Sequence, residues 1–528
     1  MAKTKVLFVA AELTPLAKVG GLADVIGALP KSLRKKGADS RIVIPKYGII
    51  DEKKYPLKLV ADNIEVPFNG QKEKIRIFAS LLPGSDVIVY LIDHLKYLGA
   101  GGVYFEKDAS SGGASRECQR FTFFARCIQE IFSPLNFWPD IIHCHDWHVG
   151  IVPFLLKERA KKDKLFPKMK ILLTIHNIAY QGKYNYDEAT AYLNLKKAEG
   201  PVMKHDKNNP VTIDYSFLGK YSYDEATKYL NLKGDKNLEE KLKKYDSVTI
   251  DYLQQAIAYA DLLNTVSPTY AKEILTPAYG EGLEKYLLAR KNDLSGIVNG
   301  IDTEIFNPKT DPNLAKNYSA VNPSGKIEDK KDLQKITGLA IDENIPVLGV
   351  VGRLADQKGL DLLIPVLPDL VKRNIQLVIL GSGLSKYEEI AQKMAADFPK
   401  NVFTKIGFDA SLAQKIYAGS DLFLMPSRFE PCGLGQLIAM RYGTIPVVRK
   451  TGGLKDTVEE FNPKSGRGTG FLFKNFDAKE LLAAIEKSLK IYQNKRAWRK
   501  LVKNAMNQNF SWDRSGQEYL KLYKKLYH

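Results

Sequence analysis

Short apolar runs alternate with longer amphipathic segments through the first half of the chain. Uninterrupted apolar runs predict strands that are buried on both faces, and apolar residues at helical spacing predict the helices that cover them. The predicted strands are 6–11, 40–45, 75–81, 87–92, 140–143 and 170–175, and the predicted helices are 22–36, 120–132 and one that starts near residue 150. This alternation predicts a parallel sheet with helices on both faces.

The second half of the chain repeats the same pattern. Its predicted strands are 346–352, 375–381, 402–406, 422–426 and 445–448, and its predicted helices include 385–397, 412–418 and 434–442. Each half therefore predicts a doubly wound α/β domain. In sheets of this kind, ligands bind at the carboxyl ends of the strands.

Turn-forming residues separate the two halves. Pro268, Pro277 and the pair Asn299-Gly300 interrupt the stretch between them. The predicted parts are a first domain over 1–265, a linker region over 266–300, a second domain over 301–509, and a terminal helix within 510–528 that crosses back onto the first domain. We expect the ligand site to lie in a cleft between the two domains.

Composition narrows the class of protein. The 528 residues contain no apolar run close to the ~18 residues that a membrane span needs, and residues 1–12 have no cleavage site of a secretory signal. The four cysteines lack disulfide or metal-binding spacing, which predicts a reducing cytoplasm. The formal charge of +18 is compatible with a nucleic-acid-binding surface. The basic residues are spread along the chain without a recognition motif, however, which favours a solvated lysine-rich surface.

One segment of the first domain occurs twice. The sequence that begins at Gly182-Lys183-Tyr184 resembles the one that begins 37 residues later at Gly219-Lys220-Tyr221, and both copies contain Tyr-Asp-Glu-Ala-Thr and Val-Thr-Ile-Asp-Tyr. Two copies are too few for a repeat architecture. We interpret 182–255 as a tandem duplication at the rim of the domain, and favour a plain insertion over a binding role.

A short phrase occurs near both ends of the chain. Lys18-Val19-Gly20-Gly21-Leu22 is followed by Asp24, and Lys450-Thr451-Gly452-Gly453-Leu454 is followed by Asp456. Adjacent glycines let backbone N–H groups approach an anion, a helix N-terminus adds partial positive charge, and the lysine adds a full charge. The two copies predict two facing domains that close on one phosphorylated ligand.

Two cations follow a predicted strand of the second domain. Arg353 and Lys358 lie five residues apart, directly after the strand that ends near residue 351. Cations at that edge suit a diphosphate leaving group, whose negative charge grows as its bond breaks. A surface turn with incidental charges is the alternative interpretation.

Glu430 and Cys432 follow another strand of the second domain. A carboxylate at a strand end can accept hydrogen bonds from sugar hydroxyls or stabilise a developing oxocarbenium charge. Cys432, near a helix start, is a possible nucleophile. No histidine or aspartate partner is recognisable nearby, which favours a packing role for this cysteine.

Histidines gather at 143–148, where three of the seven lie. Their types would suit zinc, but alternation along a strand separates neighbouring side chains, so Asp146 is favoured as a group that holds sugar hydroxyls. His176 ends the next predicted strand and could hydrogen-bond near a reacting carbon; a structural histidine is the alternative.

The chain lacks a GxxxxGK[ST] loop, a GxGxxG fingerprint and an Asp-x-Asp pair, which disfavours a Walker NTPase, a dinucleotide enzyme and a metal-held nucleotide sugar.

Together these motifs resemble bacterial glycogen synthases and plant starch synthases along nearly the whole chain. The matching segments are 18–24, 145–147, 176–182, 265–268, 299–302, 352–354, 357–359, 429–434 and 451–454. Members of this family are retaining glycosyltransferases with two facing Rossmann-like domains, an architecture called GT-B. The resemblance implies that glucose passes from ADP-glucose to the non-reducing end of an α-1,4-glucan such as glycogen, in the cytoplasm, without a metal, another cofactor, nucleic acid or a membrane.

The resemblance also assigns roles to residues. It implies that Lys18 binds the nucleotide-phosphate part of the donor, that Arg353 and Lys358 bind the diphosphate, and that Glu430 holds the glucosyl unit. The first-domain residues that contact the transferring sugar would be Asp146 and His176, and the rest of the cleft would comprise Gly20, Gly21, Asp24, Thr451, Gly452, Gly453 and Leu454. Two features depart from the family pattern: Gly435 stands where threonine or serine is usual, and the 37-residue unit occurs twice.

Other functions remain open from the residues alone. Another GT-B enzyme, such as a sucrose synthase or a glucan phosphorylase, would share the architecture, although a phosphorylase would need a pyridoxal-phosphate lysine. A non-catalytic protein that binds glucan or nucleic acid through its positive charge is the alternative of a different class. The motifs do not separate ADP-glucose from UDP-glucose, because contacts to the base are not readable from them.

Overall fold

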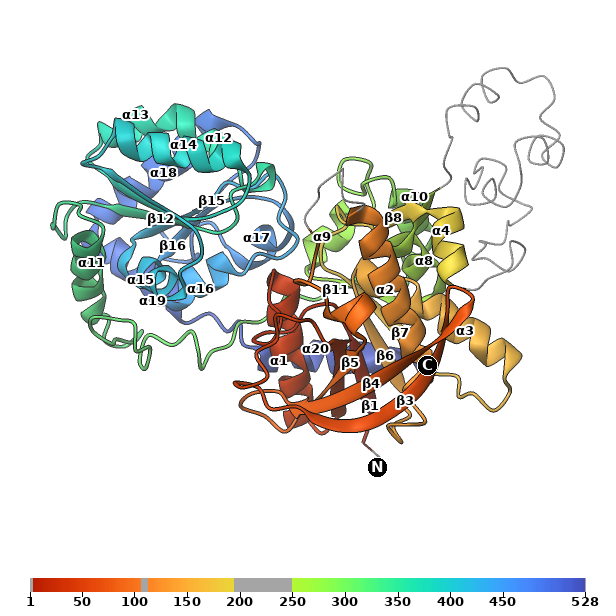
Figure 1. The fold of residues 1–528 in the computed structure, drawn as a ribbon. Helices are drawn as coiled ribbons and strands as arrows, with labels where there is room; N and C mark the ends of the chain where they lie inside the picture. The colour runs from red at the N-terminus through yellow and green to blue at the C-terminus, as the bar shows by residue number, and fades with distance from the viewer. Residues whose placement is uncertain (1–2, 106–112, 194–248, 528) are drawn as a thin grey trace, which may run out of the picture. The chain divides into compact units, whose positions relative to one another are not determined.

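The computed structural model describes residues 3–105, 113–193 and 249–527, which form two compact units (Figure 1). Unit 1 comprises Met1–Asn264, Ile274–Ser295 and Tyr519–His528, and unit 2 comprises Thr265–Glu273 and Gly296–Glu518. The chain therefore passes between the units four times. Within the described ranges, no helix is both long enough and apolar enough to span a membrane.

Unit 1 is built on a nine-stranded sheet with the order β11-β10-β7-β6-β1-β2-β5-β4-β3. Its strands are β1 (Lys5–Val9), β2 (Asp39–Pro45), β3 (Lys58–Phe68), β4 (Gln71–Leu81), β5 (Ile88–Asp93), β6 (Ile141–His145), β7 (Lys170–Ile175), β10 (Leu262–Thr265) and β11 (Leu294–Gly296). The central pairs β1–β2, β1–β6, β2–β5 and β6–β7 are parallel. The predicted α/β sheet is confirmed in this central part.

One edge of this sheet differs from the all-parallel prediction, because β4 runs antiparallel to both of its neighbours, β3 and β5. Asn69 and Gly70 join β3 to β4 with positive φ angles of 50° and 73°. A two-residue turn of this kind can only connect antiparallel strands, and its positive φ angles suit asparagine and glycine. Strand β3 was not predicted because most of its residues are exposed, so it lacks an apolar run.

Helices and short strands complete unit 1. They are α1 (Gly21–Lys35), the π-helix η1 (Leu95–Gly99), α2 (Gly113–Glu130), the 3-10 turn η2 (Trp147–Val149), α3 (Val152–Lys162), β8 (Lys183–Asn185), α4 (Tyr186–Tyr192), β9 (Thr249–Asp251), α8 (Tyr252–Tyr259) and α10 (Glu284–Ala289). Strands β8 and β9 pair antiparallel at the two ends of the duplicated segment. Most of that segment, 194–248, lies outside the described residues. Strands β8 and β9, which come before and after residues 194–248 in the chain, therefore lie side by side in unit 1.

Unit 2 is built on a six-stranded sheet with the order β14-β13-β12-β15-β16-β17, parallel throughout. Its strands are β12 (Val347–Val351), β13 (Gln376–Gly381), β14 (Val402–Ile406), β15 (Leu422–Met425), β16 (Ile445–Arg449) and β17 (Phe471–Phe473). Its helices are α9 (Pro268–Glu273), α11 (Gly325–Ile336), the 3-10 turn η3 (Asp356–Lys358), α12 (Leu360–Leu363), the 3-10 turn η4 (Ile364–Val366), α13 (Leu367–Val371), α14 (Ser385–Asp397), α15 (Ala410–Gly419), α16 (Gly435–Arg441), α17 (Gly452–Thr457), α18 (Ala478–Gln493) and α19 (Lys495–Met506).

Both faces of the unit 2 sheet are buried. Val347 of β12 packs in the cluster that includes Leu333 of α11 and Ile416 of α15, whereas its neighbour Leu348 packs in the larger core on the other side. Figure 1 shows α12, α13, α14 and α18 on one face and α11, α15, α16 and α19 on the other. This two-sided burial explains why the strands are continuous apolar runs in the sequence.

The last helix belongs to both units. Helix α20 (Trp512–Lys525) begins in unit 2, where Ser515 Oγ donates to the carbonyl of Val298 at 2.8 Å. Its last turns belong to unit 1, where the hydroxyl of Tyr519 accepts from Asn264 Nδ2 at 3.0 Å. The predicted crossing of the C-terminal helix back to the first domain is confirmed.

Candidate functional site

In unit 2, three predicted residues lie beyond the carboxyl ends of β12 and β15. Lys358 Nζ lies 2.6 Å from Glu430 Oε2, and Ser427 Oγ donates to the same oxygen at 3.1 Å. The side chain of Glu430 is only 7% exposed. Arg353 and Lys358 line one small cavity of about 40 Å³ together with Ser427. The structure thus places two cations and a carboxylate at one sheet edge.

Backbone contacts hold the Lys358 turn against the end of β15. Gly359, at the end of this turn, has a φ of 72°, and a Cβ there would lie 2.1 Å from the carbonyl oxygen of Pro426. Gln357 Nε2 donates to the carbonyl of Phe429, and the Gln357 carbonyl accepts from the N–H of Arg428. Because only glycine fits this approach, the sequence positions Lys358 beside the Glu430 loop.

The Gly-Gly turn at the start of α17 supports the same loop. Gly453 N–H donates to the carbonyls of Glu430 and Pro431 at 3.1 and 3.2 Å. A Cβ on Gly453 would lie 2.2 Å from the carbonyl oxygen of Cys432. Leu454, the last predicted residue of the turn, is fully buried in the core of unit 2. The turn therefore packs on the backbone that carries Glu430.

A carboxylate that we did not predict binds this turn. Glu273, the last residue of α9, accepts from the N–H of Gly452 at 3.0 Å and from the hydroxyl of Thr451 at 3.0 Å. Burial raises the pKa of Glu273 above its usual value. On the same pair of helices, Asp456 accepts from the N–H and the hydroxyl of Thr269. These bonds tie α9 to both the first turn and the last residues of α17. The chain enters α9 from unit 1 and returns to unit 1 after it.

The Gly-Gly turn of unit 1 has an equivalent arrangement. The N–H groups of Val19 and Gly20, just before α1, donate to Glu12 Oε2 at 3.0 and 2.7 Å. Tyr104 donates to Glu12 Oε1 at 2.6 Å and lies 2.9 Å from His148 Nε2. The two turns that look alike in sequence therefore also look alike in structure, because each binds a carboxylate of its own unit: Glu12 in unit 1 and Glu273 in unit 2.

Lys18 and Asp24 contact each other in unit 1. Lys18 Nζ lies 2.7 Å from Asp24 Oδ1, and the hydroxyl of Thr14 donates to the same oxygen at 3.1 Å. The two charged side chains are 43% and 31% exposed. Gly21 begins α1 directly after the turn. The predicted lysine thus lies at a helix start, accessible to solvent, with its charge shared with a neighbouring carboxylate.

Asp146 and His176 meet at the carboxyl ends of β6 and β7. The N–H of His176 donates to Asp146 Oδ1 at 2.6 Å, and Asp146 has a φ of 59°, a conformation that most side chains avoid. Burial raises the pKa of Asp146 to about 7 and lowers the pKa of His176 to about 3. His145 Nδ1 lies 3.0 Å from His176 Nε2. Such perturbed pKa values are typical of functional sites.

The structure also bears on the alternatives for cysteine and metal. All four cysteines are free and buried, and burial raises the pKa of the Cys432 thiol to about 12. A thiol with this pKa is largely protonated near neutral pH, which favours the packing interpretation of Cys432 over the nucleophile. Across the described parts of the chain, no three histidine, cysteine, aspartate or glutamate side chains converge as metal ligands would.

The departure at Gly435 has a local cause in packing. A Cβ at this position, the first residue of α16, would lie 2.9 Å from the ring of Phe423 on β15. Contacts at this distance require the ring to move, because real Cβ atoms almost never approach so closely. Glycine is therefore the residue that fits beside Phe423.

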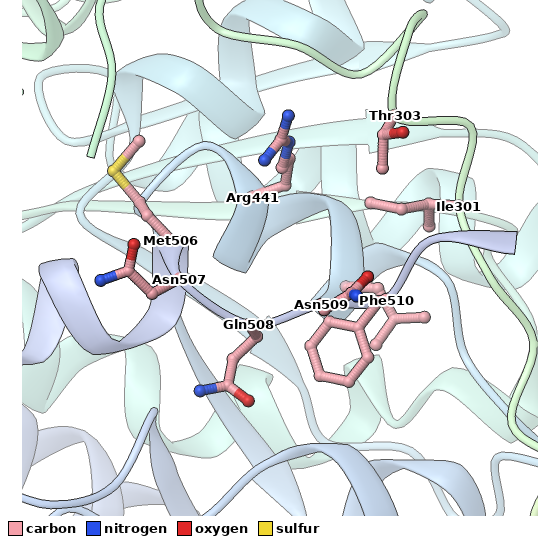
Figure 2. Close-up of a pocket in the computed structure, with 9 residues that line it drawn as sticks. Ile301, Thr303, Arg441, Met506, Asn507, Gln508, Asn509 and Phe510 are labelled. Carbon is pink, nitrogen blue, oxygen red and sulfur yellow. The ribbon is translucent and has the colours of Figure 1, made fainter. Parts of the chain in front are cut away.

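Unit 2 contains another, larger cavity away from these residues. It has a volume of about 280 Å³, and Figure 2 shows Arg441, Asn507, Gln508, Asn509 and Phe510 around it. These residues come from the end of α16 and from the segment between α19 and α20. None of the predicted site residues lines this cavity.

Several site residues were missed from the sequence. Glu12 directly follows a predicted strand, which is a signal that could have identified it. Glu273 carries no such signal, because its partner Gly452 lies 179 residues away. His145 was part of the noted histidine cluster, but its contact with His176 depends on the pairing of β6 with β7.

Comparison with known proteins identifies the class. Residues 5–289 match the family model of the starch synthase catalytic domain, and residues 332–507 match that of glycosyl transferases group 1. A sucrose-phosphate synthase from Thermosynechococcus elongatus, only 15% identical, has the same fold with a TM-score of 0.57 over 99% of both chains. The two α/β units, the two family matches and this shared fold thus define a glycosyltransferase of the GT-B architecture.

Full-length relatives identify the family. Glycogen synthases from Thermotoga maritima and Clostridium botulinum are 42% and 43% identical over 99% of this chain, and cover 98% and 99% of their own lengths. A structure of the catalytic domain of starch synthase IV from Arabidopsis thaliana, bound to ADP and acarbose, is 32% identical with a TM-score of 0.84 over 99% of both chains. The chain belongs to the glycogen and starch synthase family, as its motifs indicated.

Proposed function

We propose that this enzyme transfers glucose from ADP-glucose to the non-reducing end of an α-1,4-glucan, with retention of configuration and release of ADP. The observation that supports it most is the cluster of Arg353, Lys358 and Glu430 at one sheet edge, in a chain of the glycogen and starch synthase family. The ADP and acarbose bound to the relative from Arabidopsis thaliana support a nucleoside diphosphate and an oligosaccharide-like ligand. The four free cysteines suit the reducing cytoplasm, where we place the protein.

The cations act on the leaving group. As the bond between the anomeric carbon and the phosphate oxygen breaks, negative charge develops on the diphosphate. Arg353 and Lys358 stabilise this charge, and because they are held in place by the turns after β12, they need little rearrangement during the reaction. Lys18, at the start of α1, binds the nucleotide-phosphate part of the donor. Its ammonium is partly exposed and available to an anion, because solvent weakens its ion pair with Asp24.

The sugar is held by carboxylates and a histidine. Glu430 accepts hydrogen bonds from the hydroxyls of the transferring glucose. Asp146 and His176, at the strand ends of unit 1, contact the same glucose. The acceptor hydroxyl attacks the face from which the diphosphate departs, and the departing phosphate oxygen takes its proton. The bond formed is the new α-1,4 linkage, and the bond broken is the glycosyl–phosphate bond. Because both lie on the same face of the anomeric carbon, configuration is retained.

A donor comparison tests the proposal. Purified protein is incubated with glycogen and either ADP-glucose or UDP-glucose, and release of nucleoside diphosphate is measured. We expect faster release of ADP than of UDP, and no release without glycogen. The product made from radiolabelled donor is then digested with β-amylase, which removes maltose from non-reducing ends. Label recovered as maltose supports α-1,4 extension at that end, whereas label that resists digestion contradicts it.

A matched variant controls for contaminating activity. Glu430→Gln keeps the size of the side chain and removes its charge. The variant, purified in the same way as the parent protein, should remain folded and lose transfer. Transfer that persists in this variant, or release that is equal with and without glycogen, would contradict the proposed function.

A further inference from the structure

His145 contacts the ring of His176. It is the last residue of β6, it is fully buried, and its Nδ1 atom lies 3.0 Å from His176 Nε2. The backbone of His176 is held separately by Asp146 Oδ1 at 2.6 Å. His176 is therefore fixed at two points, one on its backbone and one on its ring.

The ring of His145 is itself immobilised by the core of unit 1. Phe8 of β1 stacks on it with centroids 5.6 Å apart and planes 17° apart, and the ring of His143 lies 4.1 Å away on the same strand. His143 is bonded in turn to the hydroxyls of Tyr523 and Thr174 at 2.9 and 2.8 Å. The position of His145 is thus set by packing, and the strand register determines that of His176.

The hydrogen bond between the two rings restricts their protons. Burial lowers the pKa of both histidines well below neutrality, so both are neutral and one nitrogen of each ring carries a hydrogen. Only one hydrogen can lie between Nδ1 of His145 and Nε2 of His176. If His176 supplied it, the hydrogen of His145 would be on Nε2. That atom is buried and has no hydrogen-bond partner within the described ranges.

A buried N–H without an acceptor is rarely observed, since it loses its bond to water and gains none. The arrangement that avoids it puts the hydrogen of His145 on Nδ1, where it is donated to His176 Nε2. The hydrogen of His176 must then be on its other nitrogen, Nδ1. The second partner of a histidine ring commonly decides its tautomer in this way.

We propose that His145 is a positioning residue that holds His176 as the Nδ1–H tautomer, so that His176 presents an N–H donor to an oxygen of its ligand. The identity of that ligand, a sugar, rests on the proposed function. The tautomer itself does not, because it follows from contacts within unit 1.

Nitrogen NMR tests the tautomer directly. Protein labelled with 15N-histidine is recorded at about pH 8, and the His176 resonances are assigned by their loss in His176→Gln. We expect the pattern of an Nδ1–H ring in the parent protein. In His145→Phe, which fills the space but donates nothing, His176 should change to the Nε2–H form that free imidazole prefers. Protonation of His176 at Nε2 in the parent protein would overturn the proposal.

Two further variants separate positioning from a merely structural effect. His145→Asn keeps an N–H donor near the position of Nδ1, so it should restore the parent pattern for His176. His94→Phe replaces a half-buried histidine that bonds Glu73 at 3.3 Å elsewhere in unit 1, so it should leave the His176 pattern unchanged. The assignment would be contradicted if the His176 pattern changed in His94→Phe, or if it stayed the same in His145→Phe.

Kinetics then connect the tautomer to the reaction. Loss of the outer hydrogen-bond partner of a metal-bound histidine typically costs about 10- to 100-fold in activity, and we take the same factor by analogy. We expect His145→Phe to lower kcat by this factor with little change in the KM for the donor, and His145→Asn to recover part of it. Unchanged kcat in a His145→Phe protein with an altered His176 pattern would show that the donor is not used. Absence of transfer in the parent protein would instead count against the proposed function and leave the NMR result standing.

Discussion

Lys358 Nζ lies 2.6 Å from Glu430 Oε2, although the two residues are 72 positions apart in the chain. The carboxylate is almost fully buried, and the lysine side chain is 29% exposed. The group assigned to the diphosphate and the group assigned to the sugar therefore contact each other directly. A change in either residue should affect both ends of the donor, and kinetics and binding can separate the two effects.

Lys358→Ala should lower kcat/KM by roughly 100-fold, because it removes a preorganised cation worth about 3 kcal/mol in the transition state. Initial rates with ADP-glucose and glycogen measure the effect. Lys393→Ala is the matched control, since Lys393 pairs with Asp397 on an exposed face of α14 and should leave the rate unchanged. A Lys358→Ala enzyme with near-normal turnover would remove this lysine from the mechanism.

Glu430→Gln should abolish most transfer, with a loss of at least about 100-fold, yet retain ADP binding. The cations of Arg353 and Lys358 remain in this variant, and Lys358 no longer shares its charge with a carboxylate. Calorimetric titration with ADP should therefore give an affinity equal to that of the parent protein or tighter. If the affinity falls as far as it does in Lys358→Ala, Glu430 acts on the phosphate side rather than on the sugar.

Lys18→Ala should raise the KM for ADP-glucose by about tenfold, the effect of one lost charge-assisted contact. Its ion pair with Asp24 is partly exposed, and such pairs contribute at most about 1 kcal/mol to folding, so the thermal midpoint should change little. Lys72→Ala, which breaks the exposed pair with Glu65 in the same unit, should alter neither quantity. An unchanged KM in Lys18→Ala would show that the lysine does not bind the donor.

Asp146 predicts a pH dependence of stability. Burial raises its pKa to about 7, above the ~3.9 of an unfolded aspartate. The folded state therefore binds more protons between these values, so the stability contributed by this group is fully present below about pH 4 and is lost as the pH rises through about 7.

Asp146→Asn tests this dependence, because the amide oxygen can still accept from the N–H of His176 but does not titrate. Between about pH 5 and pH 8, the free energy of unfolding of the variant should gain on the order of 2 kcal/mol relative to the parent protein. Urea unfolding at both pH values measures this difference. A difference between the two proteins that stays constant with pH would exclude the carboxyl group as the cause.

The two Gly-Gly turns should respond differently to alanine. Gly453→Ala places a Cβ 2.2 Å from the carbonyl oxygen of Cys432, so the Glu430 loop must shift, with a loss of about 3 kcal/mol in unfolding free energy. Gly20→Ala meets no atom closer than 3.9 Å, and its φ of −138° is open to any residue. Its cost should stay below about 1 kcal/mol. Equal losses in chemical unfolding would contradict this account of the turns.

Most of the fold could be predicted from local pattern. The strand Val402–Ile406 and the helix Ser385–Asp397 were predicted with the bounds that the structure shows, because each buries apolar residues with the period of its own element. Strand β3 escaped prediction because most of its residues are exposed. The edge of a sheet buries too little surface to leave an apolar run in the sequence.

The candidate site could be predicted only in part. Lys358, Glu430, Asp146 and His176 were identifiable because each follows a strand, and the carboxyl ends of parallel strands are the usual place for ligands. Their roles remain proposals. The partners Glu12, Glu273 and His145 were not assigned. Glu12 carried the signal of following a strand, but a carboxylate inside a helix, such as Glu273, or a histidine inside a strand, such as His145, looks the same in sequence whether or not it has a distant partner.

The sequence by itself determined the alternation of strands and helices, the two α/β halves and the family, because burial and turn formation act on neighbouring residues. Only the tertiary structure decided that Lys358 pairs with Glu430, that Glu12 and Glu273 each bind a Gly-Gly turn, and that His145 bonds His176. These contacts join residues 8 to 179 positions apart. They depend on which strands pair and how helices pack, and no local pattern of polar and apolar residues encodes that choice.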